Sequence, residues 1–169
     1  MSIIGGLEVH RRQITFDWVD TDTGQTRQGQ LAPASREHLR GWLEQFAGQQ
    51  AAFALEGCTG WRYVAEELQL AGITARLAEP ADTGALGGRK RHAKTDRADA
   101  RHLRDLLVAG RLPESWIPPT QVLEARTQVR RYKPLVDQRS AWQQRIHAVL
   151  FTTGCRPSPA CWSPNAASA

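Results

Sequence analysis

A short apolar run closed by glycine, "AAFALEG" at 51–57, is the feature that most constrains how this chain can fold. Its length and composition are typical of a strand that is buried on both faces. Apolar residues at helical spacing lie on either side of it, from Ser35 to about Gly48 and over 60–72. Ser35 occupies the position of an N-cap. A buried strand between two amphipathic helices requires a sheet that helices cover.

Extended segments surround this helix–strand–helix unit. Three of them precede it, at 3–9, 12–22 and 26–33, with turn-forming residues between them, and they predict an antiparallel meander. The stretch "ITARLAEP" at 73–80 predicts one more strand. Three strands, a helix, a buried strand, a helix and a strand form the order of an α/β protein, and we expect a ribonuclease H-like (RuvC-like) mixed sheet flanked by helices.

A long helical segment is predicted after the sheet. Apolar residues recur at steps of three and four from Thr120 to Leu150, which indicates one long helix, or two joined at Pro134. An apolar stripe of this kind is normally buried against another helix, and we expect a homo-oligomer formed through 120–150. The Pro- and Ser-rich tail shows no periodicity and is expected to be disordered. The expected domains are therefore 1–112 (the sheet domain), 113–154 (a linker and the long helix) and 155–169 (the tail).

Composition narrows the class of protein. Hydrophobic residues make up 41% of the chain, yet no apolar run approaches the roughly 18 to 20 residues that a membrane span needs. The N-terminal "MSIIGGLEVHRR" lacks a signal-peptide layout because its basic residues follow the apolar ones. We therefore expect a cytoplasmic protein without a membrane partner. The three cysteines, Cys58, Cys155 and Cys161, are odd in number and widely spaced, so neither a disulfide framework nor a zinc site is predicted.

Positive charge is concentrated in one segment. The chain has a formal net charge of +5, and the segment from Arg89 to Arg104 alone holds an excess of five cations. Such a patch attracts a polyanion, since each neutralised phosphate releases condensed counterions. A solvated basic loop is the simpler alternative. The residues expected to contact nucleic-acid phosphates are Arg89, Lys90, Arg91, Lys94 and Arg97.

Two aspartates lie three residues apart within this basic segment. On a helix beginning near Asp96, Asp96 and Asp99 share the core-facing side with Leu103, while arginines 97, 101 and 104 take the opposite side. The simpler explanation of Asp96 is an N-cap, with Asp99 favoured by the positive end of the helix dipole.

Two glutamates complete the set of candidate acids. Glu56 follows the buried run directly, where an uncompensated charge is costly, although a strand end that surfaces is the simpler alternative. Alternation along the first strand places Glu8 on the face opposite to Leu7 and Val9, and such a residue is often merely solvent-facing.

Together the four acids predict a catalytic metal site. In a ribonuclease H-like sheet, these four positions converge at one edge, where carboxylates repel one another unless hard divalent cations lie between them. Two such ions could clamp the attacking and leaving oxygens of a phosphodiester. The predicted catalytic and metal-binding residues are Glu8, Glu56, Asp96 and Asp99.

Four stretches of the chain resemble one known family. They are "GLEVHRRQI", "FALEGCTGWRYVAEEL", "AKTDRADARHLRDLL" and "LVDQRSAWQQRIHAVLFTTG", which together span most of 6–154. The family is that of the DEDD-type insertion-sequence transposases with a RuvC-like N-terminal domain, the bridge-RNA-guided recombinases. The resemblance implies that the four acids bind Mg²⁺ for DNA strand exchange. DNA and a structured guide RNA are the implied partners.

Two departures from the family pattern shape the functional alternatives. Glu8 stands where the family has Asp, and its extra methylene lengthens the ligand. The family also has a C-terminal domain with a nucleophilic serine, and no serine here matches it, so we expect a truncated or out-of-frame transposase chain. The alternatives are a stand-alone RuvC-like, Mg²⁺-dependent nuclease, and a non-catalytic module for nucleic-acid binding or dimerisation.

Overall fold

Two compact units make up the chain, Met1–Ile117 and Pro118–Ala169. The computed structural model describes residues 2–86 and 95–154. The first unit contains the strands β1 (Ser2–Val9), β2 (Ile14–Asp20), β3 (Thr26–Leu31), β4 (Gln50–Glu56) and β5 (Thr74–Ala78). Its helices are α1 (Arg36–Leu43), the 3₁₀ turn η1 (Glu44–Phe46), α2 (Trp61–Leu70), α3 (Pro80–Leu86) and α4 (Asp96–Val108).

The five strands form one mixed sheet in the order β3-β2-β1-β4-β5. The pairs β1–β2 and β2–β3 are antiparallel, which confirms the predicted meander. The pairs β1–β4 and β4–β5 are parallel, each reached through a helical connection. This order and these directions confirm the expected ribonuclease H-like sheet.

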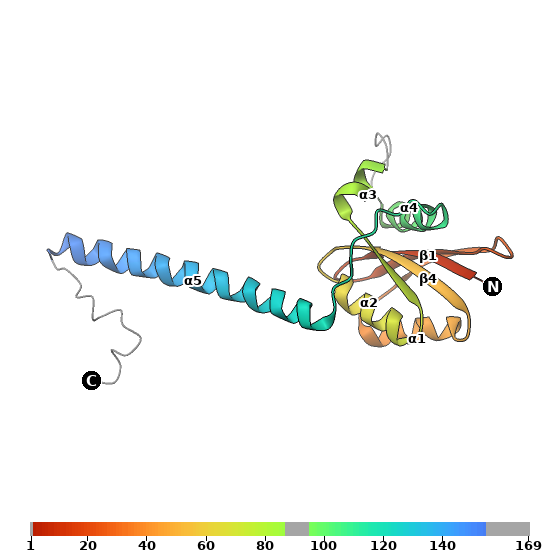
Figure 1. Ribbon diagram of the computed structural model, residues 1–169, viewed down its shortest axis with the longest axis horizontal. Helices are drawn as coiled ribbons and strands as arrows, with labels where there is room; N and C mark the ends of the chain where they lie inside the picture. The colour runs from red at the N-terminus through yellow and green to blue at the C-terminus, as the bar shows by residue number, and fades with distance from the viewer. Residues whose placement is uncertain (1, 87–94, 155–169) are drawn as a thin grey trace. The chain divides into compact units, whose positions relative to one another are not determined.

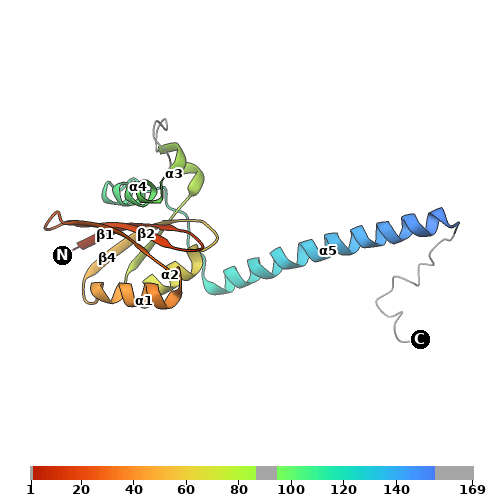
Figure 2. The ribbon, with the colours of Figure 1, turned by 180° about the vertical axis from the view of Figure 1, so that it is seen from behind.

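Helices cover both faces of the sheet, α1 and α2 on one side and α4 on the other (Figures 1 and 2). The side under α1 and α2 carries the main apolar core, with Phe53, Leu7 and Leu55 fully buried. Aromatic rings fill its centre, and those of Trp42 and Phe53 lie 5.6 Å apart, edge to face. Burial of such large apolar side chains is the main source of stability in this unit.

The opposite face is built from small residues. A Cβ at Gly6 would lie 2.1 Å from the Ala100 carbonyl oxygen and 2.7 Å from the Arg104 nitrogen, so the backbone of α4 rests directly on β1. Ala54 and Leu103 pack beside this contact. The missing side chain at position 6 therefore sets how closely α4 approaches the sheet.

A buried acid on β2 corrects one expectation for α4. Asp17 is buried beneath the helix and binds Arg104, whose side chain is only 13% exposed. Arg101 also reaches Asp17, at 3.4 Å. Arg104 was expected to point outward, and that expectation is wrong because the buried carboxylate requires a cation beside it.

A second buried acid lies on the other side of the sheet. Glu67 of α2 is almost fully buried and accepts hydrogen bonds from Arg40 Nε at 3.0 Å and Arg36 Nη1 at 2.9 Å, both on α1. These bonds lower the pKa of Glu67, with the Arg40 bond the larger cause, and the bond to Glu67 raises the pKa of Arg40. The pKa of Arg36 is raised first by its hydrogen bond to Glu66 and then by its bond to Glu67. The pair of arginines thus joins α1 to α2.

The second unit contains one continuous helix, α5 (Thr120–Thr152), which runs through Pro134. The one-helix form of the prediction is therefore confirmed, although Pro134 removes one backbone hydrogen bond. None of its described residues is buried, and large apolar side chains such as Trp142 and Leu135 are 60% and 64% exposed. No helix in the part of the chain that the structure describes is long and apolar enough to cross a membrane.

Candidate active site

Two of the predicted acids lie at the ends of neighbouring strands, Glu8 as the last but one residue of β1 and Glu56 as the last residue of β4. The parallel register pairs Leu7 of β1 with Leu55 of β4, and Glu8 and Glu56 are the residues that follow these partners. Leu7 and Leu55 belong to the core under α1 and α2, so alternation turns the two glutamates toward the face that α4 covers. Both glutamates are half-buried.

The other two acids lie in the first turn of α4. Thr95 caps the helix, because its Oγ1 accepts a hydrogen bond from the Ala98 nitrogen at 3.2 Å. Asp96 is the first helical residue and Asp99 follows one turn later, and both are half-buried. The simpler explanation of Asp96 as the N-cap is therefore wrong.

One imidazole brings acids from two distant parts of the chain together. His10 Nε2 lies 3.4 Å from Glu8 Oε1 and 3.2 Å from Asp96 Oδ1. Gln13 Nε2 donates to the other oxygen of Asp96 at 3.1 Å. His10 and Gln13 belong to the turn that links β1 to β2, so this turn connects the end of β1 to the start of α4.

His10 and Gln13 were not among the residues predicted from sequence. The only signal was that His10 comes two residues after a candidate acid, within the basic turn "HRR". Nothing in the local sequence says that this turn lies against a helix 86 residues later, since that contact depends on the sheet order. The structure therefore adds two polar residues to the predicted site.

The donor chemistry at this edge suits a hard cation, because half-buried carboxylates are the ligands that Mg²⁺ and related ions prefer. Within residues 2–86 and 95–154, however, no three His, Cys, Asp or Glu side chains are arranged as a metal-binding group. Glu8 and Asp96 share His10, whereas Glu56 is linked to Glu8 by strand register and Asp99 to Asp96 by one helical turn. The described arrangement therefore links two of the four acids, Glu8 and Asp96, through the imidazole of His10.

Most of the predicted phosphate-binding residues, Arg89, Lys90, Arg91 and Lys94, lie outside the described residues. Arg97 is described, and it is exposed on the first turn of α4 between Asp96 and Asp99. Its guanidinium therefore belongs to the same helical turn as the two acids and is accessible to a ligand.

A family model described as "Transposase", that of the IS110-type DEDD transposases, matches residues 6–154. The chain belongs to this transposase family. The match covers both described units and all four predicted acids. It confirms the resemblance drawn from the sequence motifs, and membership makes DNA transposition or recombination the broad functional class of the chain. No curated protein matches the chain in sequence.

The solved structures that are similar to parts of this transposase-family chain include the following two. One is "T. thermophilus RuvC in complex with Holliday junction substrate", at 10% sequence identity and a TM-score of 0.44, covering 67% of this chain and 99% of that one. The other is the ethanolamine utilization protein EutJ from Carboxydothermus hydrogenoformans, at 14% identity and a TM-score of 0.30, covering 51% of this chain and 40% of that one.

Proposed function

We propose that this transposase-family chain binds DNA through its basic residues and holds Mg²⁺ at the edge of the sheet where β1, β4 and α4 end or begin. The observation that supports this most directly is the shared contact of His10 with Glu8 and Asp96, 3.4 and 3.2 Å from the imidazole. Residues 88 positions apart in sequence thus supply carboxylates to one place.

The proposed ligands are Glu8, Glu56, Asp96 and Asp99, whose oxygens suit a hard divalent cation. Mg²⁺ bound there would supply electrostatic stabilisation to the oxygens of a phosphodiester under attack. His10 and Gln13 orient Asp96, because they occupy both of its carboxylate oxygens. The close seating of α4 on Gly6 holds the helix that carries Asp96 and Asp99 against the strand that carries Glu8.

The basic residues have a separate task in this proposal. Arg97, with Arg89, Lys90, Arg91 and Lys94, would contact phosphates of DNA or of a structured guide RNA. The α5 helix is the proposed route to a homo-oligomer, since its exposed apolar side chains include Trp142 and Leu135.

Thermal unfolding with and without Mg²⁺ tests the metal site. In chelator, Asp96→Asn is expected to leave the melting temperature unchanged or to raise it, because one of several neighbouring carboxylates is neutralised. With Mg²⁺ at about 100 times its dissociation constant, the wild-type protein should gain about 2.7 kcal/mol, and the variant should lose most of that gain. Asp99→Asn should behave in the same way.

Asp105→Asn is the matched control, because this exposed acid lies on the same helix outside the proposed site and its carboxylate accepts hydrogen bonds from the neighbouring Arg104. It should keep the full response to Mg²⁺. Equal responses of wild type, Asp96→Asn and Asp105→Asn would remove the metal site and favour the non-catalytic nucleic-acid-binding module.

A further inference from the structure

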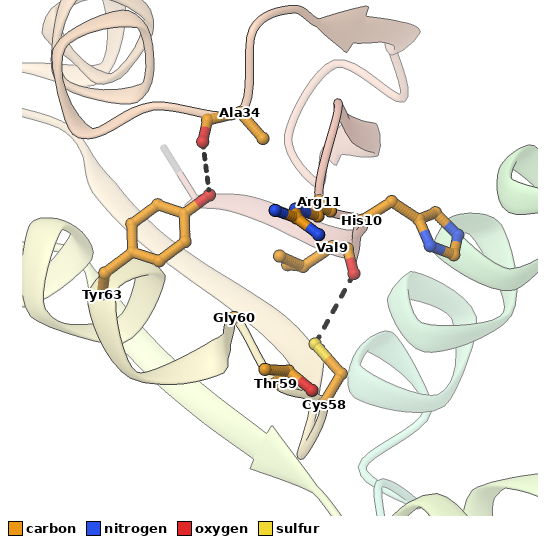
Figure 3. Close-up of a pocket in the computed structure, with 8 residues that line it drawn as sticks. All are labelled: Val9, His10, Arg11, Ala34, Cys58, Thr59, Gly60 and Tyr63. Carbon is orange, nitrogen blue, oxygen red and sulfur yellow. Dashed lines mark hydrogen bonds between the residues drawn. The ribbon is translucent and has the colours of Figure 1, made fainter.

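A cavity of about 660 Å³ opens beside the acids, at the ends of β1 and β4. It is lined by two short segments that lie just after proposed ligands in the chain: Val9, His10 and Arg11 follow Glu8, and Cys58, Thr59 and Gly60 begin two residues after Glu56. Tyr63 and Ala34 close its far side (Figure 3). Cavities of about 300 to 1,000 Å³ are typical of sites for small organic groups.

The walls of the cavity are mainly apolar and are held by hydrogen bonds. The Tyr63 hydroxyl donates to the Ala34 carbonyl at 3.2 Å, and the Cys58 thiol donates to the Val9 carbonyl at 3.6 Å (Figure 3). Burial raises the pKa of the Tyr63 hydroxyl above its usual value. The cavity therefore offers an aromatic ring among apolar walls.

Two neighbouring residues with basic side chains line the cavity and point to different sides. The imidazole of His10 points toward α4, whereas Arg11 lies on the side of Tyr63 (Figure 3). Arg11 is exposed, so its guanidinium can meet an anion at the mouth of the cavity. An apolar, aromatic space with a cation at its rim, next to acids proposed to hold Mg²⁺, matches the chemistry of a nucleotide.

We infer that this cavity receives one unstacked base of a nucleic-acid strand, with the Tyr63 ring as a wall against the base and Arg11 on the adjoining phosphate. The inference rests on the proposed function, because the strand is brought here by the same edge of the sheet. A base removed from its stack recovers part of the lost stacking energy on an aromatic side chain, whatever its sequence.

The test compares two single-stranded ligands of equal length and charge, an oligothymidylate and an abasic oligomer with the same phosphates and no bases. The wild-type chain, with Mg²⁺ present, should bind the oligothymidylate about tenfold more tightly. Tyr63→Leu should abolish most of this preference, and Tyr63→Phe, which loses the hydroxyl and keeps the ring, should retain it. Thermal unfolding of both variants checks that the first unit remains folded.

A second pair of variants tests the phosphate contact. Arg11→Ala and Arg12→Ala each remove one exposed cation, but only Arg11 lines this cavity. Arg11→Ala should weaken both ligands about threefold and reduce the salt slope by about one, and it should also diminish the preference for bases. Arg12→Ala should leave that preference at its wild-type value.

The outcomes separate this inference from the proposed function. Salt-dependent binding of both oligomers with equal affinity, or a full preference for bases in Tyr63→Leu, would overturn the base site and leave DNA binding intact. Binding of neither oligomer would overturn the proposed function together with this inference.

Discussion

The two faces of the sheet are built from different materials. The face under α1 and α2 buries Phe53, Leu55 and other large apolar side chains. The face under α4 has Gly6, Ala54 and a buried Asp17–Arg104 pair, and it ends in the proposed site. Apolar packing tolerates small adjustments, whereas a buried ion pair and a backbone contact demand one geometry. The face under α1 and α2 therefore supplies most of the stability, whereas the face under α4 fixes the position of that helix on the sheet.

The largest expected loss of stability comes from truncating a large apolar side chain on the face under α1 and α2. Phe53→Ala should lower the free energy of unfolding of the first unit by about 4 kcal/mol, because it removes a fully buried ring from an aromatic cluster. Urea unfolding followed by tryptophan fluorescence measures this loss. Leu103→Ala, on the α4 face, should cost about 3 kcal/mol.

The same two variants also distinguish the two faces of the sheet by how far Mg²⁺ raises their melting temperatures. Phe53→Ala should keep the metal-induced rise in melting temperature, whereas Leu103→Ala should lose part of it because α4 carries two of the proposed ligands. An equal rise in melting temperature with Mg²⁺ in both variants would contradict the idea that the α4 face, and not the apolar face, positions the proposed ligands.

An intermediate effect is expected from Glu67, the buried acid that joins α1 to α2. Its pKa is lowered in the folded protein, so its stabilisation is complete above the unfolded pKa, near 4.5, and is lost as the pH falls through the folded value. Glu67→Gln should therefore cost about 2 kcal/mol at pH 7. The difference from wild type should shrink as the pH falls below about 4.

Urea unfolding at a series of pH values from neutral to acid measures this dependence. Glu44→Gln is the matched control, because Glu44 is exposed at the end of α1, and it should change the stability little at any pH. A difference between Glu67→Gln and wild type that stays constant with pH would show that the charge of Glu67 is not what joins the helices.

The smallest effect compares the caps of helices on the two faces. Ser35 caps α1 and Thr95 caps α4, each by accepting a hydrogen bond from a backbone nitrogen three residues on. Ser35→Ala and Thr95→Ala should each cost about 1 kcal/mol. Only Thr95→Ala should also weaken the response to Mg²⁺, since it frays the turn that holds Asp96. Thermal unfolding in chelator and in Mg²⁺ separates the two effects.

Local signals in the sequence were sufficient for most of the fold. The run at 51–57 became β4, and Ser35 caps α1 as predicted, because burial pattern and capping depend on neighbours in sequence. The short helix α3, Pro80–Leu86, was not predicted. It begins one residue beyond β5, after Glu79, and has no apolar stripe long enough to show helical periodicity.

Long-range polar pairs were beyond reach of the sequence. Asp17 and Arg104 are 87 residues apart, and nothing near either residue indicates that each compensates the other. His10 is similar, because its contact with Asp96 depends on where α4 lies across the sheet. The position of Glu8 could be predicted by alternation along β1, whereas the partners of its carboxylate could not.

Gly6 in β1 has no side chain to separate the strand from α4. Because the main chain of α4 touches the strand there, the gap between the two carriers of the acids is set by atomic radii and has no side chain that could be trimmed or enlarged. The reach of the proposed ligands can then change only through the length of their own side chains, so Glu8→Asp would shorten that reach by one methylene while the gap between β1 and α4 stays constant.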